Sequence, residues 1–413
     1  MNPAPRVSPD PGALYWGARV WHNDPMNLDT FIQERGLRVV LKPLVSIKQK
    51  ASVGHEARLR GPEGFRADAV RLEIARAGET VGFDRWFRRE SLNAFKAAGA
   101  PGLLLLGFET SVLDQGVAGS GHVGQLVAEM SLDPSHIVLA IRESKVEDAA
   151  ALKDFVARYR AQGFLIALRE LGEGHSNLKR LTLTRPDMIK VSAGLGADLD
   201  KTFVAREIVK SLAALSRKIG ALIVAEGVVT EDQALAALDI GVDMLQGPFF
   251  GEEPGEIAGR IEALAARHKT TSVDKSKTAQ RRARETEGLL SAGLRALGGA
   301  RPEEFDAILE RVIRESPAVE CLFAVNPAGA QVSETHVRPG VAFKRSALFH
   351  PARPGADHSM KEYVYLLMDG FMNRFRTDPY VSLASGNPCV TLSGVFRDAG
   401  NNNHILCMDV PWD

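Results

Sequence analysis

The chain has 413 residues, of which 45% are hydrophobic and 25% charged, and 51 Lys and Arg balance 51 Asp and Glu. These values are typical of globular domains and exclude a chain that is disordered throughout. The balanced charge gives no reason to expect binding to nucleic acid or to an acidic membrane surface. No apolar run approaches the roughly 20 residues of a membrane span, and the polar start is unlike a signal peptide, so we expect a cytoplasmic protein.

Residues 1–26 contain several Pro and Gly and are expected to form an N-terminal arm. From residue 27 to 268, short apolar runs alternate with longer amphipathic runs, which predicts a parallel sheet closed into an α/β barrel of about eight strands. The predicted strands are Arg38–Val45, Ser52–Leu59, Leu103–Phe108, His136–Ile141, Phe164–Leu168, Asp187–Val191, Ala221–Ala225 and Met244–Gln246. The predicted helices are Ala69–Ala77, Asp84–Ala98, Val123–Glu129, Val146–Gln162, Thr202–Gly220 and Thr230–Asp239.

Charged side chains stand at the end of the second predicted strand. Because side chains alternate along a strand, Glu56, Arg58 and Arg60 are expected to share one face. Three charged groups buried without partners would be very costly, so this face should line solvent or a polar pocket.

The segments LKPLVSI (residues 41–47) and GHEARLRG (residues 54–61) resemble the opening of EAL domains, which are barrel phosphodiesterases and receptors of the bacterial messenger cyclic di-GMP. The family has Glu-Ala-Leu where this chain has Glu56-Ala57-Arg58. Further segments at the predicted strand ends follow in the family's order: GFETS, AIRES, IALRELGEGHS, DMIKVS, VAEGVVTEDQ and LQGPFF. The resemblance implies an EAL-type (β/α)8, TIM-like barrel.

The resemblance also implies where two catalytic metal ions would lie, and most of the expected ligands are changed. Ala140 stands where the family has a metal-binding Glu, and Glu109 replaces a metal-binding Asn. Arg169 and Glu170 replace a pair of aspartates. Four residues of the family's catalytic site are retained: Glu56, Lys190, Glu226 and Gln246.

A guanidinium at position 169 opposes a metal ion, because two like unit charges ~4 Å apart repel by ~4 kcal/mol near a protein surface. We expect Arg169 to pair with Glu56, Glu109 or Glu226 in place of the metals. No cofactor is therefore expected, and the barrel is predicted to be catalytically inactive. The alternative is a phosphodiesterase with a rearranged site that binds Mg²⁺ or Mn²⁺ through Glu56, Glu109, Glu170 and Glu226.

Four residues are candidates for binding the dinucleotide: Arg60, Lys42, Arg58 and Glu253. The resemblance implies a phosphate-binding Arg at position 60, and Arg suits bidentate phosphate contacts. Lys42 replaces the family's Gln, and Arg58 replaces an apolar Leu. Two interpretations stay open: the cations bind phosphate, or they only neutralise nearby carboxylates.

Residues 269–301 are rich in charge and lead into leucines at helical spacing, which predicts a linker helix. From 302 to 413 the pattern predicts an antiparallel α+β domain, and the segment DPYVSLASGNPCVTLSGVF resembles PAS-like or Cache-like sensor domains. The predicted helices are Glu303–Glu315 and Lys361–Phe375, and the predicted strands are Ala318–Val325, Tyr380–Ala384, Cys389–Phe396 and His404–Val410.

All three cysteines, Cys321, Cys389 and Cys407, fall in this last domain without Cys-x-x-Cys spacing. They are predicted to be reduced, buried thiols, with a redox pair as the alternative.

The sequence thus predicts a bacterial, catalytically inactive EAL-like signalling protein. It would act as a cyclic di-GMP receptor or scaffold, as a homodimer, and pass a conformational signal to an unidentified signalling protein. One alternative is the cyclic di-GMP phosphodiesterase with a rearranged metal site. The other is a protein-interaction module that needs no nucleotide.

Overall fold

The computed structural model describes residues 27–108, 121–142, 149–172, 179–344, 347–368, 370 and 372–412. The chain divides into two compact units, Met1–Ser272 and Val273–Asp413. The predicted N-terminal arm lies outside the described residues. No described helix is both long and apolar enough to cross a membrane.

The first unit is built on a closed eight-stranded barrel in which each strand pairs with its neighbours in chain order. Strands β2 to β8 are parallel, but β1 runs antiparallel to both β2 and β8. A turn at residues 47–50 joins β1 directly to β2. A turn this short cannot hold the crossover that parallel strands need, so this pair forms a hairpin. The strands are β1 (Arg38–Ser46), β2 (Ala51–Arg60), β3 (Leu103–Phe108), β4 (Ile137–Arg142), β5 (Leu165–Leu171), β6 (Met188–Val191), β7 (Leu222–Ala225) and β8 (Met244–Leu245).

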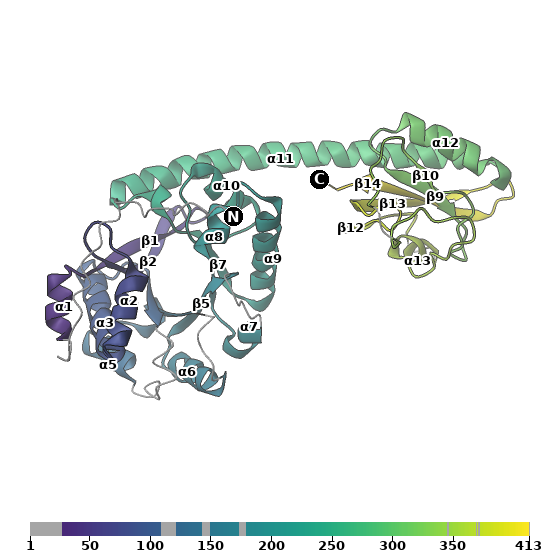
Figure 1. Ribbon diagram of the computed structural model, residues 1–413. Helices are drawn as coiled ribbons and strands as arrows, with labels where there is room; N and C mark the ends of the chain where they lie inside the picture. Colours follow the sequence, from purple (N-terminus) through teal and green to yellow (C-terminus); the bar gives the residue numbers. More distant parts are fainter. Residues whose placement is uncertain are drawn as a thin grey trace, which may run out of the picture. The chain divides into compact units, whose positions relative to one another are not determined.

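Helices surround the strands (Figure 1). Apolar side chains fill the layer between strands and helices, and a separate apolar cluster, which includes Leu105, Val138 and Ala140, fills the inside of the barrel. The helices are α1 (Leu28–Glu34), α2 (Ala67–Arg76), α3 (Thr80–Ala97), α5 (His122–Glu129), α6 (Ala149–Ala161), α7 (Lys179–Thr184), α8 (Ala193–Ala197), α9 (Phe203–Ile219) and α10 (Glu231–Asp239).

Helix α11 (Pro254–Leu297) has 44 residues and begins within the predicted barrel domain. All residues from 273 to 282 are exposed. A helix without a packed face there depends on its backbone hydrogen bonds and on pairs of charged side chains, such as Lys277 with Asp274.

The second unit contains an antiparallel sheet in the order β10-β9-β14-β13-β11, with β12 also paired to β13. One face of the sheet packs against the end of α11 and α12, and the other packs against α13. The elements are α12 (Phe305–Glu315), α13 (Glu362–Met368), β9 (Cys321–Val325), β10 (His336–Val337), β11 (Arg374–Arg376), β12 (Tyr380–Val381), β13 (Pro388–Arg397) and β14 (Asn403–Pro411).

The helix predicted over Lys361–Phe375 was wrong beyond Met368, because Arg374–Arg376 form strand β11. Gly370 has a φ of 72°, a left-handed conformation that glycine adopts without strain and that does not continue a right-handed helix.

Asp409 lies in the middle of this sheet and is buried. Its carboxylate accepts hydrogen bonds from Thr391 Oγ1 at 2.6 Å, Ser382 Oγ at 2.8 Å and Cys321 Sγ at 3.4 Å. Burial raises the pKa of Asp409, and these three hydrogen bonds only partly oppose the effect. The three cysteines are free and buried, as predicted.

Candidate functional site

Four residues retained from the family's pattern meet at the carboxyl ends of the barrel strands. Lys190, on β6, is fully buried, and its Nζ contacts Glu56 on β2. The same Nζ lies 2.7 Å from Gln246 Oε1 and 3.1 Å from Glu226 Oε2. Parallel strands place their carboxyl ends at one edge of a barrel, so residues far apart in the sequence converge there.

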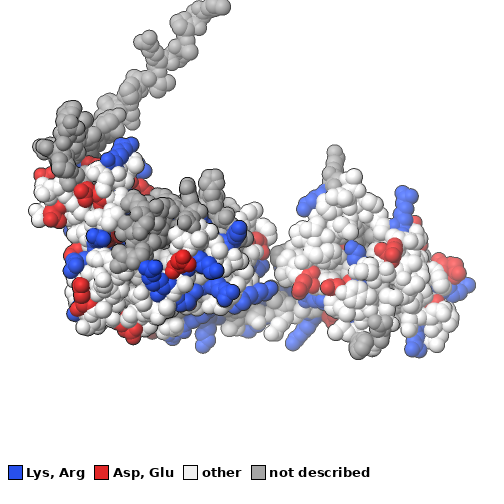
Figure 2. Space-filling view, turned by 90° about the horizontal axis from the view of Figure 1, so that it is seen from below, with Lys and Arg blue, Asp and Glu red and all other residues white. Residues whose placement is uncertain are grey.

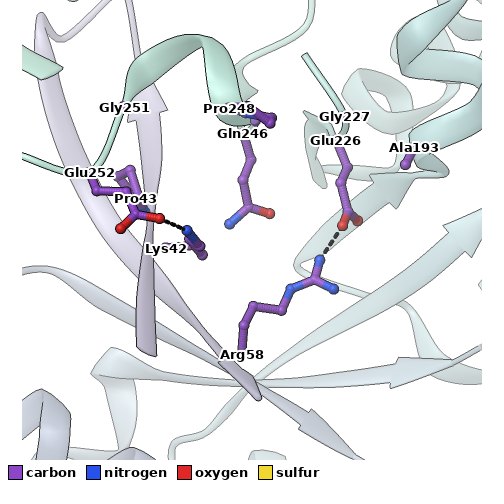
Figure 3. A pocket seen from close by; sticks show the side chains of 11 residues that line it. Lys42, Pro43, Arg58, Ala193, Glu226, Gly227, Gln246, Pro248, Gly251 and Glu252 are labelled. Carbon is purple, nitrogen blue, oxygen red and sulfur yellow. Dashed lines mark hydrogen bonds and ion pairs between the residues drawn. The ribbon is translucent and has the colours of Figure 1, made fainter. Parts of the chain in front are cut away.

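Arg58 joins this group from the same strand as Glu56. Its Nη2 lies 3.0 Å from Glu56 Oε2 and also contacts Glu226 (Figure 3). The alternation of side chains along β2 turns residues 56 and 58 to one side. Arg58 and Lys190 therefore both neutralise the two carboxylates, and we call Glu56, Arg58, Lys190 and Glu226 the charge cluster.

Arg169 forms no ion pair with Glu56 or Glu226, two of its three predicted partners. Arg169 Nη2 instead lies 3.5 Å from Glu170 Oε1. The neighbouring Arg142 holds Glu170 more closely, with its Nε 2.8 Å from Oε2. Arg58 reaches Glu56 and Glu226 because it stands on the Glu56 face of β2. Glu109, the third predicted partner, lies outside the described residues.

The cations control the protonation of the cluster. Burial alone would raise the pKa of Glu56, but the charges of Lys190, Arg58 and Arg169 outweigh it and hold this pKa well below its ordinary value. The pKa of Glu226 is also lowered, because Lys190, Arg58 and Arg169 together outweigh its burial and the nearby charge of Glu56. Both carboxylates are thus ionised at neutral pH.

The described residues do not fit the metal ions implied by the resemblance. The carboxylates of Glu56, Glu226 and Glu170 are all engaged by cations. Ala140, where the family has a ligand, belongs to the apolar interior of the barrel. One oxygen, Glu56 Oε1, has no hydrogen-bond partner among the described residues, but Mg²⁺ needs a near-octahedral set of oxygens. Among those residues, no three His, Cys, Asp or Glu are placed to hold a metal.

A cavity of about 470 Å³ opens beside the charge cluster. Figure 3 shows Gln246 lying between the Arg58–Glu226 pair and a second ion pair, Lys42 with Glu252. The cavity is lined by Lys42, Pro43, Arg58, Ala193, Glu226, Gly227, Gln246, Gly247, Pro248, Gly251 and Glu252.

The predicted ligand-binding residues have different places around this cavity. Lys42 and Arg58 line it, while Arg60 does not line it but has its Nη1 3.0 Å from Oε2 of Glu252, which does. Glu253 is exposed and does not line the cavity, whereas its neighbour Glu252 does. The sequence shows two acidic residues after the last barrel strand but does not determine which of the two side chains faces the cavity.

The sequence pattern of the EAL domain matches residues 26–253, which is more than half of the chain. The chain belongs to the EAL family. This EAL protein is 28% identical over 223 residues to the uncharacterised protein y4lL of Sinorhizobium fredii, covering 52% of this chain and 26% of that protein. It is 34% identical over 122 residues to MucR of Pseudomonas aeruginosa, a bifunctional diguanylate cyclase/cyclic di-GMP phosphodiesterase, covering 29% and 18%. The chain thus spans about a quarter or less of these two relatives.

Two solved structures resemble this EAL protein. The YkuI protein of Bacillus subtilis, with an EAL domain and in complex with substrate c-di-GMP and calcium, has a TM-score of 0.71 and 18% identity. The likeness covers 94% of this chain and 99% of YkuI, and at this identity it shows the fold alone. The PaMucR phosphodiesterase in complex with c-di-GMP has a TM-score of 0.50 and 25% identity, and the likeness covers 55% of this chain and 94% of that one.

Proposed function

We propose that this EAL protein is a non-hydrolytic receptor of cyclic di-GMP that passes a conformational signal to a protein partner. The observation that carries the proposal is the pairing of Arg58 and Lys190 with Glu56 and Glu226. These ion pairs engage carboxylates that a two-metal hydrolase would need for its cations. A divalent ion would have to displace two fixed cations and would meet the charge of Arg169 nearby.

The cavity supports binding of an anionic ligand. Arg58 and Lys42 line it, and Arg60 contacts Glu252, which also lines it. Guanidinium groups suit bidentate contacts with phosphate. Both solved EAL structures described above contain c-di-GMP. The face of the molecule in Figure 2 carries Lys and Arg as well as Asp and Glu on each unit.

The second unit is, in the same proposal, a PAS-like or Cache-like sensor module. Its support is the antiparallel sheet with helices packed on both faces. A homodimer and a cytoplasmic location belong to this proposal as well.

A hydrolysis assay tests the loss of catalysis. The purified protein is incubated with cyclic di-GMP and Mg²⁺ or Mn²⁺, and products are separated by chromatography. We expect turnover no higher than that of a Glu56→Ala control, because the carboxylates are held by Arg58 and Lys190. Turnover above this control would contradict the proposal and support the phosphodiesterase with a rearranged metal site.

Calorimetric titration with cyclic di-GMP tests the receptor role. We expect saturable heat from the wild-type protein and weaker binding by Arg60→Ala. Lys210→Ala is the control, because Lys210 is also an exposed cation paired with one glutamate but lies on α9. An absence of heat and of any thermal shift at high micromolar ligand would contradict the receptor role and favour the nucleotide-independent interaction module.

A further inference from the structure

Glu252 lies between the two cations at the open side of the cavity. Its carboxylate contacts Lys42 Nζ, and Arg60 Nη1 lies 3.0 and 3.2 Å from its two oxygens. Lys42 and Arg60 come from β1 and β2, whereas Glu252 follows β8 at the other end of the barrel sequence. One carboxylate thus bridges two cations that the receptor function would direct at a phosphate.

These contacts are formed in a position that a ligand can reach. The side chains of Lys42, Arg60 and Glu252 are 36%, 44% and 55% exposed. Hydrogen bonds from Lys42 and Arg60 lower the pKa of Glu252, so its carboxylate is ionised at neutral pH. Ion pairs this exposed are weak, because water and salt screen them. A phosphate can therefore replace the carboxylate.

We propose that Glu252 is an internal competitor of the anionic ligand, a side chain that must leave Lys42 and Arg60 before a phosphate of the dinucleotide can bind them. The inference rests on the receptor function proposed above and names a residue that weakens the binding of the ligand at that site. Each phosphodiester of the dinucleotide carries one negative charge and two non-bridging oxygens, as the carboxylate does, so the two anions compete for the same cations and the ligand displaces Glu252 at sufficient concentration. Glu252 thereby raises the ligand concentration at which the site fills.

The pair Glu252→Gln and Glu253→Gln tests this inference in the full-length protein. Both positions are exposed, and only residue 252 lines the cavity and contacts the cations. Calorimetric titration with cyclic di-GMP is expected to show about fivefold tighter binding by Glu252→Gln, because a neutral amide competes weakly for Lys42 and Arg60. Glu253→Gln is expected to bind like the wild type. Thermal melting of both variants checks that each is folded.

The outcomes separate this inference from the receptor function. Binding by Glu252→Gln no tighter than by the wild type would overturn the inference and leave the receptor function standing. Equal tightening by Glu253→Gln would also overturn it, because the effect would then follow net charge alone. Binding by Glu252→Gln with none detectable in the wild type would support it. Absence of binding by both proteins would overturn the inference and the receptor function together.

Discussion

Two buried carboxylates, Glu56 in the barrel and Asp409 in the second unit, respond to burial in opposite ways. Glu56 contacts Lys190 and Arg58, and its pKa is held well below its ordinary value. Asp409 accepts hydrogen bonds from two hydroxyls and a thiol, and its pKa is raised. Depth of burial is similar in the two sites, so the difference comes from the partners.

The comparison separates two uses of a buried acid. In the barrel, the charges of Lys190 and Arg58 balance those of Glu56 and Glu226. In the second unit, the carboxylate of Asp409 accepts hydrogen bonds from neutral donors on different segments of the sheet. Cys321 lies on β9, Thr391 on β13, and Ser382 just after β12. The first arrangement neutralises two carboxylates beside the cavity, and the second joins parts of a sheet.

The largest effect is expected from Glu56→Ala. Removing this carboxylate leaves Lys190 and Arg58 with Glu226 alone, and breaking a buried ion pair by removing one partner costs about 3–5 kcal/mol. Urea unfolding of the barrel measures the change. Glu207→Ala is the control, since it removes the exposed pair with Lys210 and should cost under ~1 kcal/mol. Equal losses in the two variants would contradict the assigned role of the charge cluster.

A smaller loss is expected from Asp409→Asn. The amide keeps one acceptor oxygen but replaces the other with a donor, which leaves Thr391 or Ser382 without its acceptor at a cost of about 1–3 kcal/mol. The unfolding transition of the second unit reports this change. No loss of stability would show that the hydroxyls find other acceptors and that Asp409 does not hold the sheet together.

The contributions of Glu56 and Asp409 to the free energy of unfolding should also depend on pH in opposite directions. The pKa of Glu56 is lowered by folding, so its contribution to stability is fully present above its unfolded pKa of about 4.3 and is lost as the pH falls through the folded value. The pKa of Asp409 is raised, so its contribution is present below the unfolded value of about 3.9 and is lost as the pH rises through the folded value.

Thermal melting at a series of pH values from acid to neutral measures both trends. The wild type is compared with Glu56→Gln for the barrel transition and with Asp409→Asn for the second unit. The difference between wild type and variant should shrink toward acid pH for Glu56 and toward neutral pH for Asp409. Trends of the same sign at both sites would show that burial, and not the partner, decides the charge.

The smallest effect is expected for the reaction of the native cysteines with a thiol reagent. Burial raises the pKa of the Cys389 thiol to about 12 and also raises the pKa values of Cys321 and Cys407. The thiolate is the reactive form of cysteine, so a thiol reagent at neutral pH should label the cysteines of the native protein very slowly. After unfolding, the reagent should label all three cysteines. Rapid labelling of the native protein would favour the redox alternative.

Much of the barrel structure could be predicted from local patterns in the sequence. The period of two along β2 placed Glu56 and Arg58 on one face, and the order of segments at the strand ends identified the EAL family. The strand predicted over His136–Ile141 also placed Ala140 in the barrel, where it is buried in the interior. These features depend on backbone geometry, which the sequence pattern carries directly.

The pairing of long side chains did not follow from these patterns. Arg58 and Arg169 both lie at the mouth of the barrel, and each side chain has many rotamers, so the sequence could not choose which of them reaches Glu226. The sequence also could not determine which of Glu252 and Glu253 faces the cavity, because the conformation of a short segment after β8 sets the direction of the two side chains. The start of α11 at Pro254 was missed although Ile257, Ile261 and Leu264 are buried there at helical spacing.

The exposed middle of α11 also has a practical consequence. Residues 273–282 are helical and exposed, and they include Lys275 and Lys277. Local opening of such a turn exposes peptide bonds to trypsin at little energetic cost, while the packed units on either side resist cleavage. Brief digestion should therefore release two fragments that part near the division between Ser272 and Val273, so that titration of each fragment with cyclic di-GMP can test the proposed roles of the two units separately.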